Sequence, residues 1–405
     1  MSRRRLLAGA GVASAALVAA SGAGPVGADT SAPVPDNSAI PFGGARQAGI
    51  TTPEQSRMVF ATYDVTTGDV AELAALLAEW THASSRLTAG KPLRGPGGQF
   101  APPPDTGEAL GLPPSQLTLT LGFGPSLFDS RFGLGRRRPA ALVDLPAFPG
   151  DDLDPSLCGG DLCIQACAND AQVAFHAIRD LTRLAFGTAT IHALQSGFGR
   201  TASAGTGRQT PRNLLGFHDG TANLDIDDEQ AMDRFVWVGH DSDQPWMVGG
   251  TYLVARRIRI HLEEWDRSTL QDQEQTVGRV KASGAPLGGT DESDPVDLFA
   301  VGVDGQLVIP DTAHIRVAGP SSNGGQAILR RGYSFADGVD PQSGELDAGL
   351  FFICFQRDPR LQFIPIQTRL SQIDALAEYL VHTGSGIFAC PPGIAGDHTY
   401  GDGLL

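Results

Sequence analysis

Alternating and helical hydrophobic patterns divide the first half of the chain into a regular series of elements. Alternation of apolar and polar positions predicts strands at 58–65, 117–123, 160–168 and 188–195. Apolar residues at helical spacing predict helices at 70–80 and 171–185, and a long Gly- and Pro-rich loop covers 90–114. The order strand, helix, strand, strand, helix, strand is that of a ferredoxin-like unit.

The second half repeats this pattern less regularly. It predicts strands at 249–259, 329–335, 350–355 and 386–389, and helical segments at 261–278, 363–370 and 374–382. Two such halves predict an α+β protein with two ferredoxin-like domains, of the dimeric α+β barrel type. We expect the chemistry in the long stretches near 206–248 and 280–327, because long loops on a rigid scaffold often carry function.

The N-terminus predicts an export signal that is separate from the fold. Arg3, Arg4 and Arg5 precede an apolar stretch that is too short for a stable membrane span, and small residues suited to cleavage follow at 26–28. The adjacent arginines favour the twin-arginine route, with a general secretory signal or an uncleaved anchor as alternatives. We therefore expect a signal peptide at 1–28 and a mature protein that is extracellular or in the cell envelope.

Composition sets the remaining boundaries and excludes some partners. Residues 29–52 are rich in Pro, Ser, Ala and Gly and are expected to form a flexible leader, followed by domains at 53–205 and 206–405. The net charge of -15 at pH 7 repels phosphate backbones, so we expect no nucleic-acid partner.

The five cysteines have no zinc-site spacing, and Cys354 lies in an apolar run as expected for a buried thiol.

Three short segments carry residues suited to chemistry, although each has a structural explanation by itself. Asp219 lies between glycines in a segment that could be an ordinary turn. His314 lies in a polar loop, where a histidine is usually solvated. Arg330 and Arg331 enter a predicted strand, so one side chain must point inward and needs an anionic partner, which a structural salt bridge could also provide.

Together and in this order, these segments resemble the dye-decolorizing peroxidase family, and within it the twin-arginine-exported branch that includes deferrochelatase/peroxidase proteins. The family motif Gly-x-x-Asp-Gly is present at 216–220 and is followed by Thr221. The His-Ile-Arg loop at 314–316 and the Arg-Arg-Gly-Tyr-Ser strand at 330–334 complete the pattern. Further similar stretches lie at 122–128, 159–165, 197–200, 263–267 and 283–287, so the resemblance runs from about Arg57 to the C-terminus.

The resemblance implies one haem b per chain, held in the C-terminal domain. It implies that His314 is the metal ligand, that Asp219 moves a proton of the peroxide, and that Arg330 supplies a fixed positive charge. Asp374 is the candidate hydrogen-bond partner of His314, with helix capping as the alternative. The expected cofactor-binding residues are Gly220, Thr221, Ala222, His314, Arg316, Gly319, Pro320, Ser321, Arg330 and Phe352.

Some positions near these motifs leave alternatives open. Residues 319–321 read Gly-Pro-Ser, where the family often has an arginine, and Arg316 could replace the contact of that arginine. His218 could influence Asp219 or face away from it. Tyr333 and Trp265 could relay electrons from bulky donors, although packing in the core is the alternative for each.

The implied function is that of a haem peroxidase, which reduces hydrogen peroxide and oxidises dyes or other bulky organic electron donors. The alternatives are a deferrochelatase that releases iron from haem, a haem-binding carrier without turnover, and an α+β domain without a cofactor. The twin-arginine export machinery would be a further partner, and assembly into a homo-oligomer stays open.

Overall fold

The computed structural model describes residues 37–95, 97–199, 210–341 and 343–405. The expected signal peptide at 1–28 and the start of the expected leader therefore lie outside the described residues. Within the described ranges, no helix combines the length and the apolar character that crossing a membrane requires.

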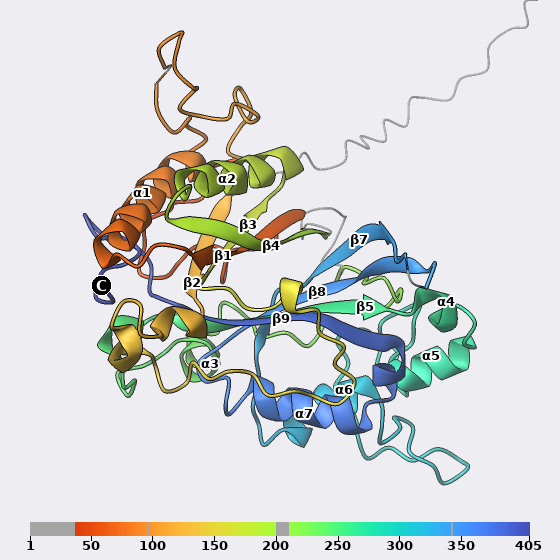
Figure 1. Ribbon diagram of the computed structural model, residues 1–405. Coiled ribbons are helices and arrows are strands. Elements are labelled where there is room, and N and C mark those ends of the chain that lie inside the picture. Colours follow the sequence, from red (N-terminus) through yellow and green to blue (C-terminus); the bar gives the residue numbers. More distant parts are fainter. Residues whose placement is uncertain (1–36, 96, 200–209, 342) are drawn as a thin grey trace, which may run out of the picture.

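The first half forms an antiparallel sheet covered by helices on one face (Figure 1). Its strands are β1 (Arg57–Val65), β2 (Thr118–Phe123), β3 (Leu162–Ala168) and β4 (Ala189–Phe198), and its helices are α1 (Val70–Thr88) and α2 (Ala171–Leu184). The strand order is β4-β1-β3-β2. Asp69 and Asp170 start the two helices, because their side chains accept hydrogen bonds from backbone N–H groups of the first turn.

The second half has the same kind of sheet, in the order β9-β5-β8-β7. Its strands are β5 (Thr251–Ile260), β6 (Leu329–Arg330), β7 (Tyr333–Val339), β8 (Leu346–Gln356) and β9 (Leu380–Cys390). Its helices are α3 (Glu229–Phe235), α4 (Leu262–Trp265), α5 (Leu270–Val277), α6 (His314–Ala318) and α7 (Phe363–Ile373). Short 3₁₀ helices lie at Pro125–Phe128, Leu134–Arg137, Pro155–Leu157, Pro245–Met247, Pro320–Ser322 and Ala375–Tyr379.

The two halves join edge to edge into one closed barrel. β2 pairs with β9 at Phe123 and Ala389, and β4 pairs with β7 at Phe198 and Ser334. Because β5 also pairs with β8, the ring of strands closes, and β6 adds a short pairing to β8. The prediction of an α+β protein is confirmed.

Both faces of the barrel wall are buried, so β1 is buried along most of its length and does not show the alternation that the sequence suggested. Val59 and Tyr63 pack with α1 and α2 on the outer face. Met58 and Phe60 point the other way and pack with Phe388 in a separate apolar cluster inside the barrel.

The clearest differences between the structure and the predicted elements lie at 261–278 and 374–382. Residues 261–278 were expected to be one helical segment but form α4 and α5, because Thr269 interrupts the helix and caps α5 by accepting from the N–H of Asp272. Residues 374–382 were expected to be helical, but only a 3₁₀ turn forms there and β9 begins at Leu380. Pairing of β9 with β5 along 380–390 overrides the local helical pattern.

Part of the expected flexible leader packs against the fold. Gln47 and Ile50 are buried. The side-chain amide of Gln47 donates to the backbone carbonyls of Leu121 and Pro391, and its carbonyl accepts from the N–H of Leu121. These bonds attach this segment to the junction between the halves, so the prediction of a flexible leader is wrong for this part.

Candidate active site

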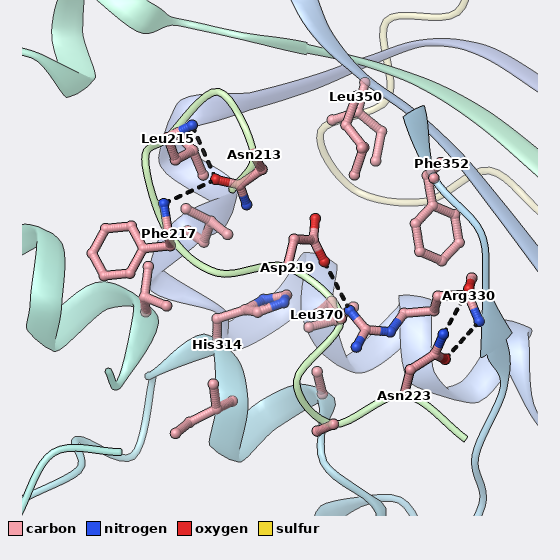
Figure 2. Close-up of a pocket in the computed structure, with 18 of the residues that line it drawn as sticks. Asn213, Leu215, Phe217, Asp219, Asn223, His314, Arg330, Leu350, Phe352 and Leu370 are labelled. Carbon is pink, nitrogen blue, oxygen red and sulfur yellow. Dashed lines mark hydrogen bonds and ion pairs between the residues drawn. The ribbon is translucent and has the colours of Figure 1, made fainter. Parts of the chain in front are cut away.

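One cavity of about 640 Å³ gathers the residues that the sequence motifs singled out. The loop of residues 211–223, strand β8 and helices α6 and α7 contribute to its wall. Asp219, Arg330, His314 and Asp374 all line it. Figure 2 shows the side chains of His314 and Arg330 converging on the same part of the cavity as Asp219.

Asp219 and Arg330 form an ion pair at the cavity wall. Nη1 of Arg330 lies 3.3 Å from Oδ1 of Asp219, and the two side chains are 30% and 32% exposed. Asn223 fixes the backbone of Arg330, because its side chain donates to the Arg330 carbonyl at 2.8 Å and accepts from the Arg330 N–H at 2.9 Å. The loop that carries Asp219 is thereby attached to β6, which carries Arg330.

The glycines on either side of Asp219 have the conformation that the motif predicts. Gly216 has φ of 83° and Gly220 has φ of 117°, a backbone region that other residues rarely adopt. The N–H of Asp219 donates to the carbonyl of Pro211 at 2.8 Å. The turn therefore holds the carboxylate of Asp219 at the cavity wall.

His314 is the first residue of α6 and is held by Asp374. Its Nδ1 lies 2.6 Å from Oδ2 of Asp374, while Oδ1 of Asp374 accepts from the N–H of Leu376. Asp374 therefore both caps the following turn and binds the histidine. Burial alone would lower the pKa of His314, but the charge and hydrogen bond of Asp374 outweigh it, so the pKa is raised.

The His314–Asp374 pair has the hydrogen-bond arrangement that is typical of a histidine that binds a metal ion. A ligating imidazole usually donates its second ring N–H to a carboxylate, which fixes the ring and strengthens the metal bond. With Nδ1 of His314 occupied by Asp374, Nε2 remains available to a ligand in the cavity. Leu350, Phe352 and Leu370 add apolar wall, which suits a flat aromatic cofactor.

Most of the predicted cofactor-binding residues line the cavity, but Arg316 does not. Those that line it, besides His314 and Arg330, are Gly220, Thr221, Ala222, Gly319, Pro320, Ser321 and Phe352. The guanidinium of Arg316 instead donates to the backbone carbonyls of Leu298, Ile309 and Pro310. Arg316 therefore fastens the loop before α6 and, unlike the other predicted cofactor-binding residues, is not among the residues that line the cavity.

The sequence motifs did not indicate Glu292, a charged residue that contacts His218 and Thr221, close to Asp219 in the sequence. Glu292 binds Nδ1 of His218 at 2.5 Å and accepts from the hydroxyl of Thr221 at 2.8 Å. Burial raises the pKa of Glu292, but hydrogen bonds from Thr210, Thr221 and His218 outweigh it, so the pKa is lowered. Although His218 lines the cavity, its polar partner is Glu292.

Arg279 and Glu54 are further charged residues of the wall that the motifs missed. Arg279 is 6% exposed, and its Nη1 donates to the carbonyl of Gly284 at 2.7 Å. Glu54 lies just before β1, where burial raises the pKa of its carboxyl group. No local pattern could have revealed either, because folding alone brings both to the cavity that Asp219 lines.

The two candidate relay residues are both buried. Trp265 is 1% exposed, packs against Phe217 and donates from Nε1 to the carbonyl of Leu215 at 3.1 Å. Tyr333 is 2% exposed and belongs to the apolar cluster inside the barrel, although it also reaches the cavity wall. Packing accounts for both side chains.

Comparison with protein families identifies the chain. Residues 47–199 match the model described as Dyp-type peroxidase, N-terminal, and residues 210–395 match Dyp-type peroxidase, C-terminal. The chain belongs to the Dyp-type peroxidase family. The resemblance inferred from the motifs around Asp219, His314 and Arg330 is therefore confirmed.

Relatives of this Dyp-type peroxidase cover nearly its whole length. A protein named deferrochelatase from Escherichia coli O157:H7 is 40% identical, over 100% of this chain and 97% of the relative. The oxyferrous complex of DtpA from Streptomyces lividans is 41% identical, with a TM-score of 0.83, over 91% of this chain and 98% of that one. A DyP-type peroxidase from Streptomyces coelicolor is 42% identical, with a TM-score of 0.85, over 91% and 97%.

Proposed function

We propose that this Dyp-type peroxidase binds one haem b in its cavity and reduces hydrogen peroxide while it oxidises a dye or another bulky organic donor. The observation that carries the proposal is that one cavity of about 640 Å³ joins the His314–Asp374 pair to the Asp219–Arg330 pair. The ferric and oxyferrous forms described for DtpA of Streptomyces lividans support an iron cofactor.

The residues around the cavity can be assigned separate parts in holding the cofactor. His314 would ligate the iron through Nε2, with Asp374 increasing the donor strength of the imidazole. The short segments Gly220–Thr221–Ala222 and Gly319–Pro320–Ser321 would line the rest of the site, together with Phe352. Haem, when bound, supplies the redox chemistry that amino-acid side chains lack.

Asp219 and Arg330 act on the peroxide. Asp219 can accept a proton from one peroxide oxygen and return it to the other, since a positioned carboxylate can serve as base and then as acid. Arg330 keeps its positive charge and, 3.3 Å from Asp219, can stabilise the negative charge that develops as the O–O bond breaks. Asn223 is a positioning residue, because it fixes the backbone from which Arg330 projects.

A steady-state assay with a dye and hydrogen peroxide tests this proposal. The haem-loaded chain should decolorize the dye only when peroxide is present, and peroxide consumption should rise in proportion to dye oxidation. Haem-loaded protein that leaves both dye and peroxide unchanged would contradict the proposal.

The name of the 40%-identical Escherichia coli relative favours deferrochelatase activity as a second candidate. Asp219 and Arg330 do not discriminate between the two reactions. Analysis of the pigment after turnover does: deferrochelatase activity leaves an iron-free, intact porphyrin and free iron, whereas peroxidase turnover leaves the iron in the haem. Porphyrin accumulation without peroxide consumption would favour the second candidate over the first.

We also propose that the barrel consists of two ferredoxin-like domains, at 53–205 and 206–405, in the dimeric α+β barrel arrangement. The matching strand orders β4-β1-β3-β2 and β9-β5-β8-β7 support this division. The haem would lie in the second domain, because His314 and Arg330 belong to it.

Finally, we propose that residues 1–28 direct the protein through the twin-arginine pathway to the cell envelope or beyond. Arg3, Arg4 and Arg5 support this route. Replacing both Arg3 and Arg4 with Lys should leave unprocessed protein inside the cell, as fractionation would show. Normal export of this double variant would favour the general secretory route.

A further inference from the structure

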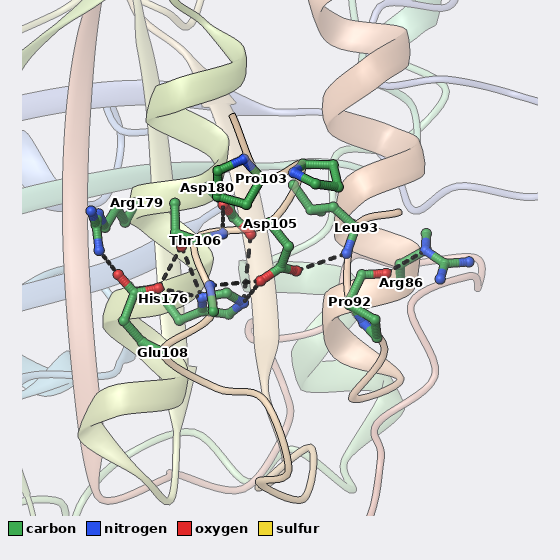
Figure 3. Close-up of polar contacts among 12 residues, drawn as sticks. Arg86, Pro92, Leu93, Pro103, Asp105, Thr106, Glu108, His176, Arg179 and Asp180 are labelled. Carbon is green, nitrogen blue, oxygen red and sulfur yellow. Dashed lines mark hydrogen bonds and ion pairs between the residues drawn. The ribbon is translucent and has the colours of Figure 1, made fainter. Parts of the chain in front are cut away.

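A buried polar cluster on the opposite part of the molecule has no role in the proposed peroxidase reaction. Asp105 lies in the loop between α1 and β2, and His176 and Asp180 lie one turn apart on α2 (Figure 3). These side chains are almost inaccessible, because Asp105, His176 and Asp180 are 8%, 4% and 0% exposed. None of the three lines the cavity that contains His314.

One oxygen of this cluster lacks a partner. Oδ1 of Asp180 accepts from the N–H of Thr106 at 3.2 Å and lies 3.6 Å from Nε of Arg183. Oδ2 of Asp180 has no hydrogen-bond partner among the described residues. A fully buried carboxylate oxygen without a donor is costly. The site therefore favours a cation next to Oδ2.

The distances from Nε2 of His176 to the two aspartates are too long for good hydrogen bonds and are close to those between ligands of one metal ion. Nε2 of His176 lies 3.5 Å from Oδ2 of Asp180 and 3.7 Å from Oδ1 of Asp105. Bonds of about 2.0–2.2 Å from a tetrahedral zinc ion separate its ligand atoms by about 3.3–3.6 Å. All three atoms lie within 4.8 Å of one another.

The other ring nitrogen of His176 has the support expected of a metal ligand. Nδ1 lies 2.9 Å from Oε2 of Glu108 and 3.2 Å from the hydroxyl of Thr106. A carboxylate on the second nitrogen fixes the ring so that the first nitrogen faces the metal. Glu108 is itself held by an ion pair with Arg179.

We propose that Nε2 of His176, Oδ2 of Asp180 and Oδ1 of Asp105 bind a divalent first-row transition-metal ion, with Zn²⁺ as the best match. The two carboxylates neutralise the ion, and a water molecule can complete a tetrahedral shell. The imidazole favours zinc over Ca²⁺ and Mg²⁺, which prefer oxygen ligands throughout. The ion would join the loop at Asp105 to α2 and so stabilise the first half of the barrel.

Metal content and zinc affinity of the haem-loaded full chain test this site. After treatment with a chelator and addition of Zn²⁺, the wild type should retain one zinc per chain through dialysis, measured separately from iron by elemental analysis. Asp180→Asn and His176→Gln should lose this zinc. Glu108→Gln should weaken zinc binding by about 10–100-fold, because it removes only the support of the ligand.

His192→Gln is the matched control. Nδ1 of His192 lies 2.8 Å from Oδ2 of Asp64, and this partly exposed His–Asp pair has no third ligand among the residues that the structure describes. This variant should keep the zinc and its affinity. Bound zinc should also raise the melting temperature of the wild type and the control but not that of Asp180→Asn.

Two results would overturn the proposal: no zinc retained by the wild type, or equal zinc in the wild type, Asp180→Asn and His176→Gln. If the ligand variants do not fold, X-ray absorption at the zinc edge of the wild type decides. We expect one imidazole among nitrogen and oxygen ligands at about 2.0–2.2 Å. Two or more imidazoles, or a sulfur ligand, would place the zinc elsewhere and refute the site.

Discussion

Replacing either residue of the Asp219–Arg330 ion pair should slow the reaction strongly but leave the free energy of unfolding nearly unchanged. Asp219→Asn keeps the size of the side chain but removes the proton acceptor, and Arg330→Leu removes the fixed charge. Both side chains are about one-third exposed at a separation of 3.3 Å, so the pair itself should contribute only about 0–1 kcal/mol to the free energy of unfolding. Neither variant should therefore unfold much more easily than the wild type.

The effect on the reaction should be far larger. General acid–base catalysis typically contributes about 10²–10⁴-fold, and one electrostatic donor about 10²–10³-fold. Rapid mixing with hydrogen peroxide, followed by absorbance of the bound haem, should show a loss of at least about 100-fold for Asp219→Asn and Arg330→Leu. The loss in the double variant should be smaller than the product of the single losses, because the two residues act on the same peroxide.

Asp225→Asn is the control for this experiment. Asp225 is exposed, lies two residues after Asn223, and its side chain accepts from the N–H of Asp227. It should react at the wild-type rate. If Asp219→Asn and Arg330→Leu bind haem normally and also react with peroxide at the wild-type rate, the assignment of these two residues is wrong, even though the family is right.

Further variants test the residues that support the site and the effect of acid on the stability of the fold. Asp374→Asn should weaken haem binding by about 10–100-fold in a haem titration, because His314 loses its carboxylate partner, and unchanged affinity would contradict that role. Asn223→Ala removes two hydrogen bonds to the backbone of Arg330. It should lower the free energy of unfolding in urea by about 1–3 kcal/mol and slow the reaction with peroxide. A wild-type rate would show that Arg330 does not need this support. Burial and the neighbouring Arg256 lower the pKa of His382 in the folded chain to about 3. As pH falls below about 6.5, the imidazole of His382 takes up a proton in the unfolded chain but not in the folded chain. The free energy of unfolding should therefore fall as pH is lowered from about 6.5 toward about 3. His382→Gln should reduce this loss of stability in urea titrations between pH 7 and pH 4. If the free energy of unfolding depends on pH as in the wild type, His382 does not contribute to the loss.

Local hydrophobic patterns predicted the first half of the fold well because its elements follow local signals. The short, mostly apolar run of β1 and the Asp caps of α1 and α2 are readable within a few residues. The pattern failed at residues 374–382, where pairing with β5 makes Leu380 the start of a long strand. It also failed at Gln47, whose burial depends on backbone groups of Leu121 and Pro391 that lie far away in the sequence.

The same distinction applies to the site. Asp219, His314 and Arg330 occur in recognisable motifs, and the glycines beside Asp219 show why that motif needs them. Glu292 occurs in no such motif and meets His218 only in the folded chain. Arg316 shows the opposite case: its place near His314 in the sequence suggested a cofactor contact, but its guanidinium binds backbone carbonyls and it does not line the cavity.

The central claim is that the cavity binds haem through His314 and that the bound haem reacts with peroxide. The absorption spectrum of the purified chain, before and after addition of hydrogen peroxide, tests it most directly when wild type and His314→Ala are compared. The wild type should show a Soret band that shifts on addition of peroxide, and His314→Ala should lose the normal band together with most of the turnover. A wild type that stays colourless after haem is supplied, or a His314→Ala variant with an unchanged spectrum and turnover, would contradict the claim.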